Sequence, residues 1–203
     1  MIKFSVVMTV YDNALELEEH LPAFLTQDYQ EGYEVIVVDE SSTDNTDDIL
    51  KLQMQNDPKL YKTFLPKPNI NVTRKKLALT IGVKAAKNEW VILSDIQSYP
   101  TSETWLKEIA ESIDSNSDII LGYFGKKGTM LKLYDEVEQA RRIIIKAERA
   151  RADGHKGKRM RRIRGKYDFI VVKKEKAHDA LSYFEKRISW IRLLGLRLGI
   201  MVK

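Results

Sequence analysis

The sequence has no cysteine among its 203 residues. Disulfide bonds and thiolate metal sites are therefore excluded, which fits a reducing compartment. The apolar run at residues 1–10 is too short to span a bilayer, and the small-residue cleavage site of a signal peptide is missing. We interpret this run as the first strand of a folded domain and expect a cytoplasmic protein.

Histidine is also scarce. The three histidines, His20, His155 and His178, are scattered and lack the spacing of metal ligands, so we expect them to be surface residues. The chain shows no internal repeat. With 43% hydrophobic and 31% charged residues it has the composition of a globular, soluble protein. Its length allows one domain with a full core, or one domain plus an appendage.

Positive charge is concentrated in one segment. Arg141–Lys166 holds twelve Lys and Arg residues against two acids, Glu148 and Asp153. Three interpretations stay open: a solvated face, contact with anionic lipid headgroups or a lipid-pyrophosphate acceptor, or nucleic-acid binding. The near absence of interleaved aromatic residues argues against nucleic acid. Contact with an anionic surface would place the protein peripherally at the inner face of the membrane.

Strand and helix patterns alternate through the first 125 residues. β-rich runs predict strands at 3–10, 33–39, 60–65, 89–94 and 118–124, with amphipathic helical patterns between them. This order predicts an α/β fold with a Rossmann-like, mostly parallel central sheet flanked by helices and joined by right-handed crossovers.

Local signals predict details of two helices. Asn13 with Glu16 has the spacing of a capping box for the first helix, and Pro22 inside the same pattern should kink or interrupt that helix. Thr73 can cap a later helix that runs to about Lys87.

The pattern changes after Gly128. Residues 1–128 are predicted to form the α/β domain, and residues 129–203 a short helical, basic region packed on it. Within the second region we expect helices at 130–152 and 174–186 and a strand at 167–173. The apolar tail at 188–203 is interrupted by Arg192 and Arg197, and core packing and membrane contact are both compatible with it.

Two aspartates end apolar runs. Asp39 follows Val35–Val38, and Asp95 follows Trp90–Ser94. Ligands of open α/β sheets bind outside the carboxyl ends of the strands, so two acids at one edge suggest a polar ligand such as a nucleotide with its ribose and a metal. Aspartates that merely cap strand ends are the alternative.

The order of three segments resembles the family 2 inverting glycosyltransferases. Ser5–Asp12 is similar to the family's first strand and base-receiving turn, Val37–Thr46 to its acid-plus-hydroxyl turn, and Arg74–Trp105 to its central helix and metal-loop strand. The resemblance covers about the first 125 residues and implies the A-type glycosyltransferase fold. It also implies transfer of a sugar, with inversion, from a nucleotide-diphosphate donor to a hydroxyl of a glycan or lipid-linked acceptor in polysaccharide biosynthesis.

The resemblance assigns roles to particular residues. Thr9 and Tyr11 would line the base pocket, Asp39 would accept a hydrogen bond from a uracil-type base, and Asp95 would bind ribose or lie beside the metal. Residues 1–128 would be the nucleotide-sugar-binding domain and 129–203 a reduced acceptor-side region.

Arg74 and Lys75 would face the diphosphate. An independent argument agrees, because Arg74, Lys75 and Lys76 at a helix N-terminus oppose the helix dipole unless an anion lies there. Three solvated bases on a surface turn are the alternative.

The metal site departs from the family pattern. The family usually has a second acid two residues after the first, but here Gln97 follows Asp95. Magnesium and manganese prefer carboxylates, so a divalent ion held by Asp95 and Gln97 is expected to bind more weakly.

The second half also departs, because the chain contains no Glu-Asp dipeptide to supply the family's usual base. Asp135, Glu136 and Asp168 are candidate bases by residue type and place in the chain, and the sequence assigns no catalytic base. A catalytically degenerate relative that binds a nucleotide or a partner without turnover is therefore the alternative function.

Overall fold

The structure is a computed structural model, and it describes residues 1–66, 74–113, 119–124, 168–177 and 198–202. Its centre is a sheet in which seven strands are described, in the order β3-β2-β1-β4-β6-β5-β7. The strands are β1 Phe4–Val10, β2 Tyr33–Asp39, β3 Leu60–Phe64, β4 Trp90–Leu93, β5 Ile119–Tyr123, β6 Phe169–Lys173 and β7 Leu198–Val202.

Most neighbouring strands are parallel. The pairs β1·β2, β1·β4, β2·β3 and β5·β7 are parallel, whereas β6 is antiparallel to both β4 and β5. The predicted α/β fold with a mostly parallel, Rossmann-like sheet is therefore confirmed. The strand β6 makes the sheet mixed, which the sequence pattern did not indicate.

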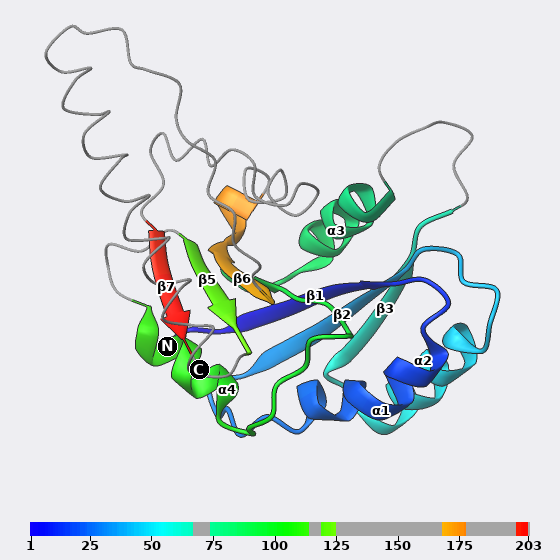
Figure 1. Cartoon of the computed structure of the whole chain (residues 1–203), viewed down its shortest axis with the longest axis horizontal. Coiled ribbons are helices and arrows are strands. Elements are labelled where there is room, and N and C mark those ends of the chain that lie inside the picture. The colour runs from blue at the N-terminus through cyan, green and yellow to red at the C-terminus, as the bar shows by residue number, and fades with distance from the viewer. Residues whose placement is uncertain (67–73, 114–118, 125–167, 178–197, 203) are drawn as a thin grey trace, which may run out of the picture.

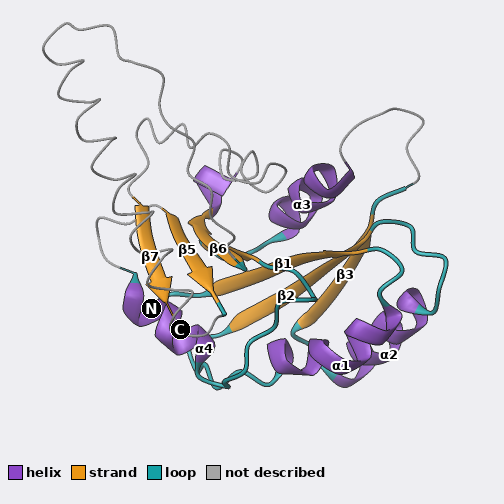
Figure 2. Cartoon of the chain, in the orientation of Figure 1, coloured by secondary structure: helices purple, strands orange, loops and turns teal. Residues whose placement is uncertain are grey.

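Helices cover both faces of the sheet (Figures 1 and 2). One face carries α3, whose Gly82 packs against Val7 and Val38. The other face carries α1, α2 and α4, which share a hydrophobic core with alternate β1 residues from Phe4 to Val10. The helices are α1 Ala14–Leu25, α2 Thr46–Asn56, α3 Arg74–Ala85 and α4 Trp105–Ser112, with a short 3-10 helix at Lys174–Lys176.

The helix α1 differs from its prediction at Pro22. The helix continues through this residue, from Ala14 to Leu25, without the predicted interruption. Proline costs about 3 kcal/mol in a helix interior because it removes one backbone hydrogen bond. Leu21, Phe24 and Leu25 are buried on either side of it, and this packing outweighs the lost bond.

The start of α1 also differs. Asn13 is the residue before the helix, but its side chain accepts a hydrogen bond from the Tyr11 amide at 3.0 Å and makes no cap bond to α1. The predicted capping box is therefore wrong. Its place is taken by Asp44, whose Oδ2 accepts a hydrogen bond from the Ala14 amide at 2.9 Å.

Parts of the second region belong to the same sheet. The predicted strand at 167–173 is observed as β6, and the apolar tail contributes β7, which the sequence did not predict as a strand. The basic segment Arg141–Lys166, the predicted helix at 130–152 and the cap Thr73 lie outside the described residues. The division at residue 128 stays a prediction. Among the described helices, none is long and apolar enough to cross a membrane.

Candidate nucleotide-diphosphate site

The predicted site residues lie at the edge formed by the carboxyl ends of β1, β2 and β4. β1 is the middle strand, with Val10 opposite Asp39 in β2 and Val7 opposite Leu93 in β4. The chain leaves β1 toward β2 on one side and returns to β4 on the other, so this edge is the switch point at which open α/β sheets bind ligands.

The two aspartates meet at this edge. Asp39 ends β2 and Asp95 follows β4 by two residues, with only β1 between the two strands. Neighbouring strands lie about 4.8 Å apart, so β2 and β4, on either side of β1, are separated by about 10 Å.

Thr9 and Tyr11 lie at the end of β1. Thr9 is the penultimate residue of the strand and is buried, whereas Tyr11 is 53% exposed just beyond it. Asp12 follows with a left-handed backbone (φ 50°), and its Oδ1 accepts a hydrogen bond from the Thr43 amide at 2.6 Å. The turns after β1 and β2 are therefore joined into one rim.

Asp39 is buried and held at one oxygen. Its Oδ1 accepts hydrogen bonds from the Ser42 amide at 2.9 Å and the Ser42 hydroxyl at 2.6 Å. Within the described residues both of these bonds end on Oδ1. A nucleotide base could therefore reach Asp39 through the Oδ2 atom.

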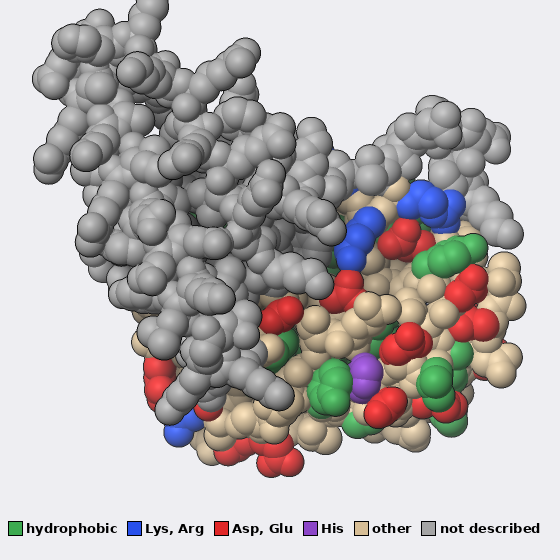
Figure 3. All heavy atoms as spheres, viewed as in Figure 1, with side chains coloured by type: hydrophobic (Ala, Val, Ile, Leu, Met, Phe, Trp, Pro, Cys, Tyr) green, Lys and Arg blue, Asp and Glu red, His purple; other side chains and the backbone are tan. Residues whose placement is uncertain are grey.

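The first turn of α3 carries two cations, one beside the loop after β2 and one beside the loop after β4. Arg74 donates from Nη2 to the Glu40 carbonyl, and its Nε lies 3.8 Å from Oε2 of the nearly buried Glu40. Lys75 Nζ lies 2.7 Å from Oδ2 of Asp95. Figure 3 shows basic and acidic side chains side by side below the start of α3. These pairs fix the loops after β2 and β4 to one helix.

Asp95 and Gln97, the two predicted metal ligands, lie in the turn after β4. Asp95 Oδ1 accepts a hydrogen bond from the Gln97 amide at 3.1 Å, and Oδ2 is held by Lys75. A divalent ion that used this carboxylate would compete with the Lys75 ammonium. The second predicted ligand is the neutral side-chain oxygen of Gln97. Such an oxygen binds hard cations more weakly than a carboxylate does.

Of the three candidate bases, Asp168 is in the described part of the chain. It precedes β6, which is antiparallel to β4 with Leu93 opposite Ile170, so Asp168 lies at the same edge as Asp95. Its Oδ2 accepts a hydrogen bond from the Phe124 amide at 2.6 Å. Asp135 and Glu136 lie outside the described residues.

Sequence reasoning missed two residues of this edge. Glu40 was not singled out, although an acid beside Asp39 in a strand-end turn could have been considered. His20 was expected on the surface, but its side chain is only 14% exposed and contacts the turn after β4. Its spacing of three from Leu17 and four from Phe24 places it on the buried stripe of α1, which the helical period could have indicated.

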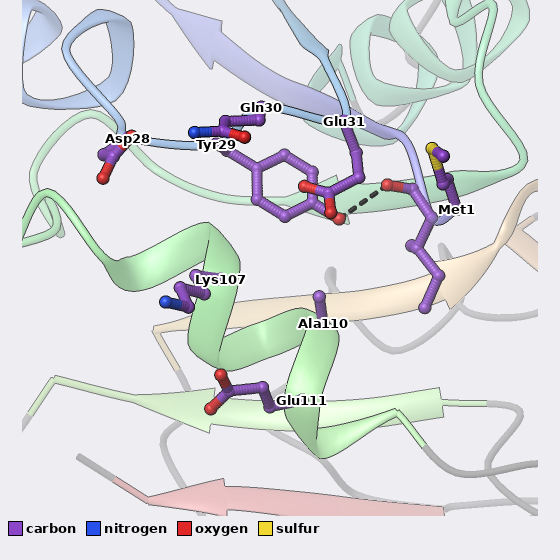
Figure 4. A pocket seen from close by; sticks show the side chains of 9 residues that line it. Met1, Asp28, Tyr29, Gln30, Glu31, Lys107, Ala110 and Glu111 are labelled. Carbon is purple, nitrogen blue, oxygen red and sulfur yellow. Dashed lines mark hydrogen bonds between the residues drawn. The ribbon is translucent and has the colours of Figure 1, made fainter.

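A separate hollow of about 550 Å³ lies at the opposite edge of the sheet. It is bounded by residues before β1, by the loop Asp28–Glu31 before β2 and by α4 (Figure 4). Tyr29 in this loop donates its hydroxyl to the Ile2 carbonyl at 2.6 Å. Because this hollow faces the amino ends of the strands, it is not the site predicted from Asp39 and Asp95.

Comparison with known proteins identifies the family. A family model described as Glycosyl transferase family 2 matches residues 5–180. The chain belongs to this family. The match extends beyond the first 125 residues and includes β6.

Two bacterial relatives match the first part of this family 2 chain. It is 31% identical over 122 residues to the poly(ribitol-phosphate) beta-glucosyltransferase of Bacillus spizizenii, and 32% identical over 123 residues to the poly(ribitol-phosphate) beta-N-acetylglucosaminyltransferase TarS of Staphylococcus aureus. Each alignment covers 60% of this chain and 19% or 21% of the relative. The chain thus spans about a fifth of the length of these relatives.

Solved glycosyltransferases share the fold. TarS 1-349 in complex with UDP-GlcNAc superposes with a TM-score of 0.61 at 19% identity, and the mannosyltransferase PcManGT from Pyrobaculum calidifontis, in complex with GDP-Man and Mn2+, with a TM-score of 0.65 at 17% identity. Each comparison covers 98% of this chain and 56% of the other. The chain therefore has the A-type glycosyltransferase fold.

Proposed function

We propose that this chain transfers a sugar, with inversion, from a uridine-diphosphate donor to a hydroxyl of a glycan or lipid-linked acceptor. The observation that carries the proposal is the meeting of Asp39, Asp95 and the Arg74–Lys75 cations at the carboxyl edge of β1, β2 and β4. In this proposal Asp39 would accept a hydrogen bond from the base, and Arg74 and Lys75 would supply positive charge for the diphosphate.

The choice of uridine rests on Asp39 and on the relatives. A carboxylate accepts the N3–H of uracil through the Oδ2 atom, while Ser42 fixes Oδ1. TarS was solved with UDP-GlcNAc and with UDP, and the curated relatives are named for transfer to poly(ribitol-phosphate). A hydroxyl-rich polymer is accordingly the proposed acceptor class.

The chemistry is displacement of the nucleotide diphosphate by an acceptor hydroxyl on the opposite face of the sugar. Lys75 and Arg74 would stabilise the negative charge that develops on the leaving group. Asp168 is the proposed base because it lies at the same edge. In that role it would accept the proton of the acceptor hydroxyl at hydrogen-bond distance. Magnesium or manganese, if bound at Asp95 and Gln97, would add positive charge at the same diphosphate.

The ion pair between Lys75 and Asp95 favours a second candidate function, that of a family relative that binds the nucleotide without turnover. Gln97 replaces an acid, and Lys75 holds the remaining carboxylate. Incubation with uridine-diphosphate sugars separates the two candidates. Release of uridine diphosphate, increased by a polyol-phosphate or glycan acceptor, supports the transferase. Tight binding with no release from any donor supports the second candidate, and no binding of any nucleoside diphosphate contradicts both.

A further inference from the structure

The side chain of His20, on α1, contacts the turn that carries Asp95. Its Nδ1 lies 2.9 Å from the Ile96 carbonyl oxygen. Its ring stacks on Tyr99, with the centroids 4.0 Å apart and the planes 20° apart. Because a carbonyl only accepts hydrogen bonds, Nδ1 carries the hydrogen. This contact needs no positive charge on the imidazole, since Nδ1 donates in the neutral tautomer as well as in the protonated ring.

The turn itself is short and closed. The Ser98 amide donates to the Asp95 carbonyl at 3.0 Å, and the Gln97 amide donates to the Asp95 carboxylate at 3.1 Å. The Ile96 side chain is buried in the core. The Ile96 carbonyl and the Gln97 amide belong to the same peptide group, so the hydrogen bond from His20 restricts the plane whose N–H donates to the Asp95 carboxylate.

The turn is held from both faces of the sheet. His20 reaches it from α1, on the face that carries the main hydrophobic core, and Lys75 reaches Asp95 from α3 on the other face. If a flexible lysine alone held the Asp95 carboxylate, the carboxylate could adopt several orientations. The bond from His20 restricts the backbone of the turn, whereas Lys75 holds the Asp95 carboxylate.

We propose that His20 is a positioning residue for the donor site, acting through the Ile96 carbonyl to aim the Asp95 carboxylate. This inference rests on the proposed function, because it takes Asp95 as a donor-binding group. His20 itself does not touch the donor. The donating N–H at Nδ1 is the property that matters, and the stacked ring of Tyr99 keeps the imidazole in place.

Two substitutions test the hydrogen-bond donor of His20 and its aromatic ring separately. His20→Asn places an amide nitrogen close to the position of Nδ1 and keeps the hydrogen bond, whereas His20→Phe keeps a stacked ring and loses the donor. Hydrogen exchange of the peptide covering residues 94–99 is measured in the ligand-free protein, and affinity for uridine diphosphate is measured by calorimetry. Glu18→Gln, on an exposed position of the same helix, is the matched control.

We expect His20→Phe to speed exchange at residues 94–99 about fivefold and to weaken uridine-diphosphate binding by about the same factor, which corresponds to the loss of one hydrogen bond. We expect His20→Asn and the control to stay within about twofold of the parent protein. Unchanged exchange in His20→Phe, or equal losses in His20→Asn, would overturn the proposal.

The two readouts also separate this inference from the proposed function. Faster exchange with unchanged uridine-diphosphate affinity would show that His20 is merely structural, which contradicts the proposal. If the parent protein binds no nucleoside diphosphate, the proposed function fails, and the link from His20 to a donor site fails with it even if exchange changes as expected.

Discussion

The ammonium of Lys75 and the carboxylate of Asp95 lie 2.7 Å apart, although the two residues belong to opposite ends of the α3–β4 unit. The positive charge of Lys75 is therefore paired with the Asp95 carboxylate, which would otherwise be the group best placed to hold a metal. A divalent ion that bound Asp95 would therefore compete with Lys75 for one group, and the contribution of each to donor binding can be measured separately.

Replacing Lys75 with Gln removes that competition. In the presence of a chelator we expect Lys75→Gln to weaken uridine-diphosphate binding about tenfold, because a charge-assisted hydrogen bond contributes about 1.5–3 kcal/mol. Added manganese should restore binding more in the variant than in the parent protein, since Asp95 is released. Calorimetry with and without manganese measures both effects.

The matched control for this prediction is Lys84→Gln, an exposed lysine in the last turn of the same helix. It should bind as the parent protein does under both conditions. If Lys75→Gln behaves like Lys84→Gln, the Lys75 side chain has no part in holding the diphosphate.

Gly82 sets how closely α3 approaches the sheet. A Cβ at this position would overlap Cγ1 of Val7 and lie 3.1 Å from Cγ2 of Val38. Val7 is fully buried in β1, so it has little room to move. We expect Gly82→Ala to lower the free energy of unfolding by about 1–3 kcal/mol through overpacking, as measured by urea unfolding.

A double-mutant cycle tests the cause of that loss. Val7→Ala removes the overlapping methyl groups, so Gly82→Ala should cost much less in the Val7→Ala background than in the parent protein. Equal costs in the two backgrounds would show that the destabilisation arises from another contact, such as the one with Val38.

Asp44 joins the starts of two helices. Its carboxylate accepts hydrogen bonds from the Thr46 amide at 3.0 Å and the Ala14 amide at 2.9 Å. Desolvation raises the pKa of Asp44, but hydrogen bonds from Thr46 and Ala14 outweigh it and hold the pKa below its ordinary value of 3.8. The bonds therefore favour the charged form in the folded protein.

The sign of the pH effect follows from that direction. A group whose pKa is lower in the folded state stabilises the protein above its unfolded pKa, and this contribution is lost as the pH falls below about 4. Asp44→Asn should lower the free energy of unfolding by about 1 kcal/mol at pH 7 and by less at pH 3. Urea unfolding across this range measures the difference; an equal loss at both values would contradict the role of the charge.

Much of the edge could be predicted from local sequence. The apolar runs before Asp39 and Asp95 specify buried parallel strands, and parallel strands present their carboxyl ends together. The position of both acids at one edge followed from these two facts. The cations of the first α3 turn were predicted to face an anion, and they are placed at this edge beside Glu40 and Asp95.

Other features depend on contacts between distant residues, which local patterns do not encode. β6 pairs antiparallel with β4 although about 80 residues separate them, and β7 joins β5 from the tail. The helix continues through Pro22 because its neighbours are buried in the core. The helical period could have indicated that His20 is partly buried, but not its partner, because the Ile96 carbonyl lies 76 residues away.

The central claim is that the edge between Asp39 and Asp95 binds a uridine nucleotide. Calorimetric titration of the parent protein and of Asp39→Asn with uridine diphosphate tests it most directly. We predict saturable binding to the parent protein and about tenfold weaker binding to the variant, because the charge that receives the uracil N–H is lost. Equal affinity of the two proteins, or no binding to the parent protein, would contradict the account.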